Sequence, residues 1–573
     1  MTIKLLSGAA GLLYGAAALA QPAAGPVALS AQDCQVSRMA PALAGFSPTK
    51  SATLDAARWV PAGSERVGKA SVAVPAHCDI EGTIGAHRGA PGDTAYGNHF
   101  RLRVPALWRG RFVFQGGGGN DGVLGNALGV LKNGESALAQ GYAVAAQDSG
   151  HSGRGAAFAL DRQAYTDFAY EGVHEVARAS KALLQTLAGQ GPWYSYFVGC
   201  SNGGREALVS AQRYTDFDGV VAGAPGFAVY DQWLQNMSVL KAVARAAGAP
   251  AGQAPADTSR AFSDAQLDYA AKYFMDRCDR LDGIQDGVIS NYLACSAKPA
   301  DYAALECMAD GGDSGDARCL SSLQTGVLRE IHTGLVDHAG KLVFPGFLPG
   351  GIEPRLRGAY LGVPGAPAPL GALYGLMENF YFMGYGFRAY PGVTGPAGEL
   401  ASYPASALAY VTGFDLERDS AALAPGRLDF HASNTDPQRP GPNFEAFHRR
   451  GGKLLMYTGS ADHAVHARGV MGLMDRLKAQ YGGAGDMARL YVIPGMDHCR
   501  GGTTADQFDE LAPLAAWVER GVAPGALPAH ALPGSPLDPQ GSGVSRPLCA
   551  YPAYARYRGG DPAAAASYAC STD

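Results

Sequence analysis

The sequence lacks an excess of basic charge. Its 51 Asp and Glu outnumber its 46 Lys and Arg, which gives a formal net charge of −5 at pH 7 and a pI near 6.2. Proteins that bind nucleic acid through its phosphates concentrate Lys and Arg on one face. Nucleic acid is therefore not expected as a partner.

Long apolar runs are also scarce, and the one that stands out lies near the N-terminus. It covers residues 5–18, follows Lys4 and leads to the small residue Ala20. The run is shorter than the roughly 20 apolar residues that a membrane-spanning helix needs. A positive start, a short apolar stretch and small residues before a cleavage point are typical of a signal peptide. The pattern predicts a signal peptide over residues 1–20, cleavage after Ala20, and a secreted or periplasmic protein with no membrane partner.

Glycine, proline and cysteine, by contrast, are well represented. The 78 Gly and 36 Pro indicate many loops, and 573 residues exceed a typical single domain of about 100–200. The 10 Cys are an even number in a chain expected to leave the reducing cytoplasm. They predict a disulfide framework, although composition alone leaves the pairing open.

The most informative motif is Gly199-Cys-Ser-Asn-Gly203. A strand-like run, 195–199, precedes it, and helix-forming residues, 205–211, follow it. A serine framed as G-x-S-x-G between a strand and a helix is typical of the exposed nucleophile of a serine hydrolase. The alternative is a glycine-rich turn whose serine only caps the helix. The flanking pattern favours Ser201 as a nucleophile.

A nucleophilic serine needs a base and an orienting acid. A predicted strand, 453–457, leads to Asp462, and a second, 490–494, leads to His498. Asp462 is the predicted acid and His498 the predicted base. The order Ser, Asp, His is that of an α/β-hydrolase rather than of chymotrypsin or subtilisin.

Other residues compete for these roles. Asp497 adjoins His498, but neighbouring side chains usually diverge, so it is the weaker candidate for the acid. His463 and His466 are alternatives for the base, with polar loop residues as the favoured interpretation. His151 is expected to be structural.

A second glycine-rich stretch, 116–119, follows the strand-like run 111–115. An α/β-hydrolase takes one oxyanion donor from the residue after the nucleophile and another from an early loop of this kind. The N–H groups of Asn202 and Gly117 are the predicted donors. A nucleotide-binding interpretation fails, because neither G-x-G-x-x-G nor a P-loop lysine occurs in the required context.

Ser201 and Asp462 are separated by more chain than a helix and a strand require. We predict an α/β fold in which residues 21–226 and 450–573 form an α/β-hydrolase core, with a lid domain, 227–449, inserted between nucleophile and acid. Within the lid, residues 374–390 are rich in aromatic side chains, which suit an aromatic acyl group or the lid's own core. Arg388 among them is either a partner for a substrate carboxylate or an ordinary surface residue.

The predicted lid also contains an aspartate-rich loop, 278–289, with two Asp-Gly pairs. Calcium takes 6–8 oxygen ligands from carboxylates and backbone carbonyls. Three aspartates supply carboxylates and two apolar residues supply carbonyls in this interpretation, although the spacing is not that of an EF-hand and plain turns are the alternative. The predicted ligands are Asp279, Asp282, Ile284, Asp286 and Val288.

Two cysteines flank the proposed chemistry, since Cys200 precedes Ser201 and Cys499 follows His498. A disulfide between them would hold the serine and the histidine within reach of proton transfer, about 2.6–3.2 Å. Two buried thiols are the alternative, which export from the cell disfavours.

The chain resembles the tannase and feruloyl esterase family over nearly all of its mature length. The matching motifs are Asp148-Ser-Gly-His151, Gly199-Cys-Ser-Asn-Gly-Gly-Arg205, the loop 279–289, Gly459-Ser-Ala-Asp462 and Pro494-Gly-Met-Asp-His-Cys-Arg-Gly-Gly502. The resemblance implies the triad Ser201, Asp462 and His498, and it implies structural calcium in the aspartate loop. It also implies the disulfides Cys34–Cys78, Cys200–Cys499, Cys278–Cys295, Cys307–Cys319 and Cys549–Cys570.

The expected function is that of a secreted, monomeric serine esterase that hydrolyses esters of hydroxybenzoic, hydroxycinnamic or terephthalic acids through an acyl-enzyme, with no organic cofactor. Two alternatives stay open. One is a protein of weak activity that binds polyphenols or carbohydrates on a hydrolase scaffold. The other is a serine peptidase with the same fold.

Overall fold

The computed structural model describes residues 25–47, 49–90, 92–253, 257–307, 319–366, 409, 411–417 and 443–573. The predicted signal peptide, the aromatic stretch 374–390 and Arg388 lie outside these residues. Among the described residues, no helix has the length and apolar character needed to cross a membrane.

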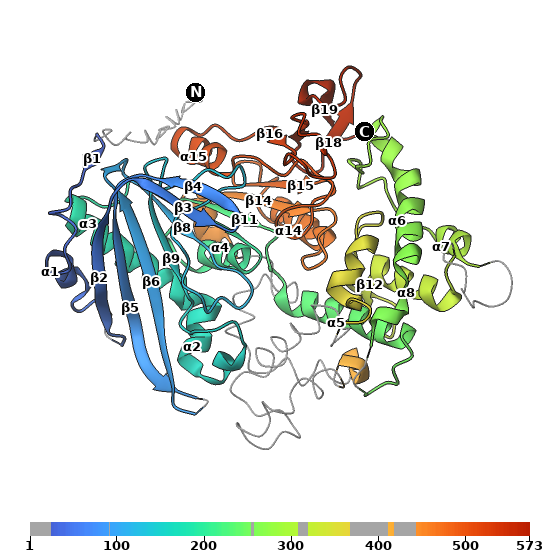
Figure 1. Ribbon diagram of the computed structural model, residues 1–573, viewed down its shortest axis with the longest axis horizontal. Helices are drawn as coiled ribbons and strands as arrows, with labels where there is room; N and C mark the ends of the chain where they lie inside the picture. The colour runs from blue at the N-terminus through green and yellow to red at the C-terminus, as the bar shows by residue number, and fades with distance from the viewer. Residues whose placement is uncertain are drawn as a thin grey trace, which may run out of the picture.

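The molecule is built around a nine-stranded sheet (Figure 1). Its strands, in spatial order, are β15 (Ala488–Ile493), β14 (Lys453–Gly459), β11 (Gly219–Gly223), β10 (Tyr194–Cys200), β8 (Arg111–Gln115), β9 (Ala143–Gln147), β6 (Thr94–Pro105), β5 (His77–Gly89) and β2 (Ala52–Val60). The strands from β15 to β9 run parallel, and β6, β5 and β2 are antiparallel to their neighbours. The strand order reverses locally, because β9 follows β8 in sequence but lies between β8 and β6.

The parallel strands are apolar on both faces, as strands covered by helices on both sides must be. Successive side chains point to opposite faces of a strand. On β8, Phe112 and Phe114 therefore pack into one core, and Val113 packs into the other. Helices α3 (Gly172–Ala188), α4 (Asn202–Arg213) and α14 (Ala467–Gln480) contribute to the first core, and α15 (Leu511–Arg520) contributes to the second.

Most of the described part of the insertion is helical. It comprises α5 (Val229–Ala246), α6 (Asp264–Cys278), α7 (Pro299–Leu305), α8 (Ser322–Thr333), the strands β12 (Gly334–Val336) and β13 (Leu342–Pro345), and the single π-helical turn η7 (Arg357–Leu361). Figure 1 shows α6, α7 and α8 on the opposite side of the molecule from β2, β5 and β6. Apolar residues of this region belong to the same core as α3, α4 and α14. The last helix before β14, α13 (Glu445–Arg449), packs against α4. The insertion therefore shares its core with the sheet, and the exact domain limits stay a prediction.

Smaller elements complete the fold. They are β1 (Val27–Ala28), α1 (Val36–Met39), β3 (Gly63–Val67), β4 (Ala70–Val74), β7 (Leu107–Trp108), α2 (Arg162–Thr166), β16 (Leu527–His530), β17 (Ser545–Leu548), β18 (Tyr554–Tyr557) and β19 (Tyr568–Ser571). The predicted α/β-hydrolase architecture is confirmed. The carboxyl ends of β10, β14 and β15 lie at the same edge of the sheet, with β11 between β10 and β14, and carry the loops that the sequence singles out.

Candidate active site

Ser201 occupies the sharp turn between β10 and α4. Its backbone has φ 63° and ψ −118°, a conformation that L-residues rarely adopt. The neighbouring glycines are required by packing: a Cβ on Gly199 would lie 2.6 Å from the carbonyl of Gly203, and one on Gly204 would lie 2.4 Å from the carbonyl oxygen of Gly223. The side chain of Ser201 makes no capping hydrogen bond to α4. The helix-cap alternative therefore does not hold.

The structure brings Ser201, His498 and Asp462 together. The Oγ of Ser201 donates to Nε2 of His498 at 2.9 Å. On the other side of the ring, Nδ1 of His498 lies 2.9 and 3.0 Å from the two carboxylate oxygens of Asp462. Both contacts lie within the range that proton transfer needs. Asp462 fixes the tautomer in which Nε2 is free to accept the serine proton.

Asp462 is 1% exposed and is held by its own loop. The N–H groups of Ala464 and Val465 each donate to its Oδ1 at 2.8 Å. Burial lowers the pKa of His498, but the charge and hydrogen bond of Asp462 raise it more, so the net shift is upward. The arrangement thus stabilises an imidazolium ion, the species that a general base becomes when it accepts a proton.

Asp497 has a different role from the acid of a triad. Its carboxylate accepts hydrogen bonds from Nδ1 of His463 and from the backbone N–H of His498, at 2.8 and 2.9 Å, and it pairs with Nε of Arg355 at 3.1 Å. Burial raises the pKa of Asp497, but these partners lower it below the usual range. Asp497 therefore binds the backbone N–H of His498 rather than its ring. The Nδ1 of His463 is bonded to Asp497, which leaves His463 outside the triad.

The remaining histidines stay outside the triad. His466 is completely buried, its Nε2 donates to the side-chain oxygen of Asn236 at 3.1 Å, and burial lowers its pKa to about 3. His151 stacks on Phe158 with ring centroids 3.8 Å apart, and burial lowers its pKa. Both are neutral, packed side chains.

A disulfide joins the two loops of the triad. Cys200 and Cys499 are bonded with their Cα atoms 6.1 Å apart and 299 positions apart in sequence. Cys499 also has a positive φ of 64°, close to the value of 63° at Ser201. The other bonded pairs are those named above: Cys34–Cys78, Cys278–Cys295, Cys307–Cys319 and Cys549–Cys570. Five disulfides fit an oxidising compartment.

A buried lysine that the sequence did not reveal supports the turn after His498. The Nζ of Lys132 donates to the carbonyl oxygen of Cys499 at 2.6 Å and pairs with Asp506 at 3.3 Å. Glu510 accepts the backbone N–H of Lys132 through both of its carboxylate oxygens at 3.0 Å. Burial lowers the pKa of Lys132. In the sequence, the only sign of this role is that the charged residue Lys132 follows an apolar stretch.

The glycine stretch lies directly against the start of α4, where Gly203 donates to the carbonyl of Gly117 at 3.1 Å. The N–H of Gly117 donates at 2.9 Å to the carboxyl group of Glu206, so in this structure the predicted oxyanion donor already has an acceptor. The N–H of Gly118 donates to Asp121 at 2.7 Å. The backbone N–H of Asn202 is among the first four of α4, which have no partner within the helix. Both oxyanion assignments stay predictions.

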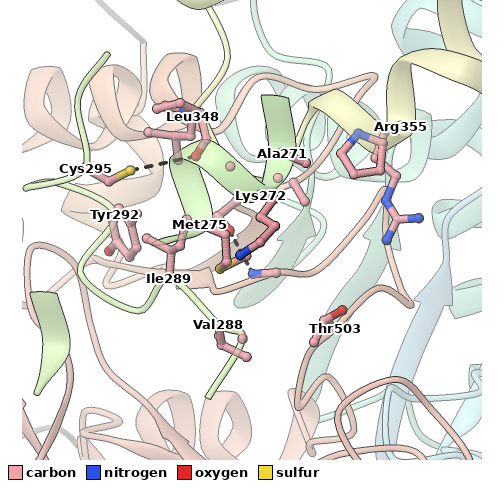
Figure 2. Close-up of a pocket in the computed structure, with 18 of the residues that line it drawn as sticks. Ala271, Lys272, Met275, Val288, Ile289, Tyr292, Cys295, Leu348, Arg355 and Thr503 are labelled. Carbon is pink, nitrogen blue, oxygen red and sulfur yellow. Dashed lines mark hydrogen bonds between the residues drawn. The ribbon is translucent and has the colours of Figure 1, made fainter. Parts of the chain in front are cut away.

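Two cavities adjoin these loops. One, of about 470 Å³, is lined by the glycine stretch, Ser201, His498 and Tyr457. The other, of about 360 Å³, lies between α6, the aspartate loop and the loops that carry the acid and the base. Figure 2 shows Met275 and Tyr292 on its apolar side, with Arg355 and Thr503 opposite. Ser201 lines the first cavity. The second cavity lies between the insertion and the core.

The aspartate loop offers buried oxygen ligands without a matching cation. Asp279 is 6% and Asp282 1% exposed, and within the described residues neither forms an ion pair. Burial raises the pKa of both carboxyls, that of Asp282 to about 6. Asp286 pairs with Arg546 at 2.6 Å. The donor chemistry fits a hard cation such as calcium.

The three aspartates are not drawn together as closely as a bound ion would draw them. Their oxygens mostly accept backbone N–H groups of the loop, including that of Gly287 at 3.0 Å. In the described part of the chain, the trio whose potential ligand atoms all lie within 4.8 Å of one another is His338, Asp415 and Glu417, at the surface. The predicted ligands thus fit by type and burial, and calcium stays a proposal.

Comparison with known proteins identifies the family. The family model described as tannase and feruloyl esterase matches residues 84–366 and 432–571. The mono(2-hydroxyethyl) terephthalate hydrolase of Piscinibacter sakaiensis is 34% identical over 554 residues, which cover 91% of this chain and 89% of that protein. A probable feruloyl esterase of Arthroderma benhamiae is 30% identical over 494 residues, covering 82% of each.

Solved structures agree in fold. Feruloyl esterase B from Aspergillus oryzae superposes with a TM-score of 0.70 at 22% identity, covering 93% of this chain and all 100% of that one. Tannin acyl hydrolase from Aspergillus niger gives 0.66 at 20% identity, covering 96% and 97%. From the extent of these matches, we conclude that the chain belongs to the tannase and feruloyl esterase family and is a carboxylic ester hydrolase.

Proposed function

We propose that the protein hydrolyses esters of aromatic acids, hydroxybenzoic, hydroxycinnamic or terephthalic, through an acyl-enzyme on Ser201. The observation that carries the proposal is the continuous chain of hydrogen bonds from Ser201 through His498 to Asp462. The names of its relatives support the substrate class, since they include hydrolases of terephthalate and ferulate esters.

In the first half of the reaction, Nε2 of His498 takes the proton of Ser201 while Oγ attacks the ester carbonyl. The carbonyl oxygen becomes an oxyanion, which the N–H of Asn202 and an N–H of the glycine stretch stabilise. When the tetrahedral intermediate collapses, the bond to the alcohol oxygen breaks. That oxygen takes the proton from His498 and leaves as the free alcohol.

In the second half, water replaces the alcohol. His498 removes a proton from the water, whose oxygen attacks the acyl-enzyme carbonyl. Collapse of this second intermediate breaks the bond to Oγ of Ser201, which regains its proton from His498. The aromatic acid is released, and the enzyme returns to its starting state without any oxidant or cofactor.

Calcium is proposed as a structural ion. Asp279, Asp282 and Asp286 would hold it with the carbonyl groups of Ile284 and Val288. It would neutralise the carboxylates of Asp279 and Asp282, which are buried and pair with no cation among the described residues. The aspartate loop lines the cavity next to the acid and the base. The ion would therefore support the wall of the site rather than take part in the chemistry. Secretion is proposed from the disulfides and the N-terminal pattern.

The test is hydrolysis of a panel by the mature protein and by its Ser201→Ala variant. The panel contains methyl gallate, methyl ferulate, mono(2-hydroxyethyl) terephthalate and a peptide anilide. Serine-dependent turnover of an aromatic ester, with little turnover of the anilide, is expected. Activity that survives in Ser201→Ala, or a preference for the anilide, would overturn the proposal.

A further inference from the structure

Two buried acids, Asp121 and Glu206, connect the glycine stretch to the turn between β10 and α4 that carries Ser201. We call this turn the nucleophile turn. Asp121 is 4% exposed and binds both sides of this junction. Its Oδ1 accepts the N–H of Gly118 at 2.7 Å. Its Oδ2 accepts the side-chain amide of Asn202 at 2.8 Å and the hydroxyl of Ser149 at 2.6 Å. One carboxylate thus fixes both loops that are predicted to supply oxyanion donors.

Glu206 binds the same loops from the opposite direction. It lies in the second turn of α4 and is 3% exposed. Its Oε2 accepts the N–H of Gly117 at 2.9 Å. Its Oε1 faces the amide of Gln147 at 3.2 Å and the hydroxyl of Ser149 at 3.3 Å. Ser149 therefore lies between the two carboxyl groups.

One buried cation, Arg205, acts electrostatically on both acids. Its guanidinium donates hydrogen bonds to Asn202, Phe168 and Ala169 at 2.6–2.8 Å rather than to either carboxyl group. Two buried carboxylates that share one cation leave one negative charge uncompensated, which is costly because both must give up water in a region of low dielectric constant. Retaining a proton on one of them removes this cost.

Two other titratable groups lie in the loop after β9. The carboxylate of Asp148 binds Nδ1 of His99 at 2.6 Å, and burial lowers the pKa of His151, which favours its neutral form. Burial and the negative charge of Asp121 raise the pKa of Glu206 to about 8. The raised pKa favours Glu206 as the member of the pair that carries a proton.

The glycine stretch packs tightly against Asp121 and against the start of α4. A Cβ on Gly117 would lie 1.8 Å from Oδ1 of Asp121, and one on Gly203 would lie 2.7 Å from the carbonyl oxygen of Gly117. Any separation of the two carboxyl groups must therefore move the glycine stretch relative to Ser201.

We propose that Asp121 and Glu206 share one proton and act as a positioning pair, which holds the glycine stretch against the nucleophile turn while that proton is present. Loss of the proton places two negative charges in one buried site and drives the loops apart. The pair thus sets an alkaline limit on activity. The activity readout of this inference rests on the proposed function.

The stability of the protein gives a second readout that does not depend on activity. A carboxyl group whose pKa is raised on folding contributes stability that is fully present below its unfolded pKa of about 4.5 and is lost as pH rises through its folded value. For Glu206 this window runs from about pH 4.5 to about pH 8. The melting temperature is expected to fall across this window, and Glu206→Gln is expected to reduce that fall.

The experiment measures kcat/KM from pH 6 to 10 and the melting temperature from pH 4.5 to 9 for the wild type, Glu206→Gln, Glu206→Ala and a control, Asp167→Asn. The control also removes a buried acid of raised pKa, about 7, but Asp167 pairs with Lys50 and has no bond to the glycine stretch. Wild type and control should lose activity by about tenfold per pH unit above pH 8. In Glu206→Gln the side-chain oxygen can still accept the N–H of Gly117, so this variant should be active and should not lose activity as the pH rises above 8. Glu206→Ala should be at least tenfold less active than the wild type at every pH.

Two results would overturn the inference. One is an alkaline fall of activity in Glu206→Gln that matches the wild type. The other, decisive even if no ester is turned over and the proposed function fails, is a melting temperature with the same pH dependence in Glu206→Gln and the wild type.

Discussion

The nucleophile turn and the aspartate loop contrast in how their polar groups are compensated. At the nucleophile turn the chain itself supplies every partner: His498 for Ser201, Asp462 for His498, and a disulfide that joins the two loops. In the aspartate loop, the buried carboxyls of Asp279 and Asp282 accept hydrogen bonds from backbone N–H groups of the loop and of Ser290, which follows it. The hydrogen-bond chain of the candidate triad is thus complete, whereas Asp279 and Asp282 pair with no cation among the described residues.

Removing the serine tests the first half of this contrast most directly. Ser201→Ala deletes the nucleophile but leaves the packing of the turn, so the fold should survive. We expect kcat to fall by about 10⁴–10⁶-fold with an unchanged melting temperature. Ester hydrolysis and thermal unfolding measure both. A residual rate within tenfold of wild type would mean that the turn does not carry the nucleophile.

Removing the disulfide at the triad should be the next largest effect. The double variant Cys200→Ser with Cys499→Ser frees two loops 299 positions apart, which should cost about 2–5 kcal/mol of stability and lower kcat as well. The control is the same change at Cys307 and Cys319, which close a loop of only 12 positions. That control should lose less stability and keep its kcat. Equal losses of kcat in both variants would contradict a special role for the bond at the triad.

Metal removal should lower the stability of the protein through the aspartate loop, and this loss should not depend on the nucleophile. A ligand that binds only the folded state at 100 times its Kd adds about 2.7 kcal/mol of stability. A chelator should therefore lower the melting temperature of the wild type and of Ser201→Ala alike, and have little effect on Asp282→Asn. Asp276→Asn, in an exposed ion pair on α6, serves as the matched control. A melting temperature that chelation leaves unchanged would exclude bound calcium.

The loss of activity at acid pH tests whether Asp462 raises the pKa of His498. The base acts only when it is neutral, and its pKa is raised by Asp462. Activity should therefore fall by about tenfold per pH unit below a midpoint that lies above 6.5. In Asp462→Asn the midpoint should move downward, and kcat should fall as well. A midpoint that stays in place would show that another group titrates.

The smallest effect is expected at Asp497, which supports His498 only through the backbone. Asp497→Asn weakens single hydrogen bonds to His463 and His498, each worth about 1 kcal/mol, and removes the ion pair with Arg355. We expect kcat/KM to fall by no more than about tenfold. A loss as large as that of Asp462→Asn would make Asp497 the orienting acid instead.

The sequence predicted the elements whose signal is local. The apolar run 195–199 lies within β10, the run 453–457 within β14, and the loops that follow carry the expected side chains. The family motifs further named the disulfides and the aspartate loop. The conformation of Ser201 also follows from the glycines around it, since a Cβ on Gly199, Gly203 or Gly204 would lie within 3.0 Å of backbone atoms.

The missed features depend on contacts between distant segments. Nothing near Lys132 indicates that it reaches the carbonyl of Cys499, 367 positions away. Asp121 and Glu206 look like ordinary loop and helix-surface residues until the glycine stretch folds onto α4. Sequence patterns locate side chains along an element, but only packing decides which charged groups lose their water.

The bond between Cys200 and Cys499 also orders events in time during biosynthesis. At about 5–20 residues per second, the 299 positions between these cysteines take about 15–60 s to synthesise. The nucleophile is therefore made long before its base, and no nascent or truncated chain that ends before His498 can be active.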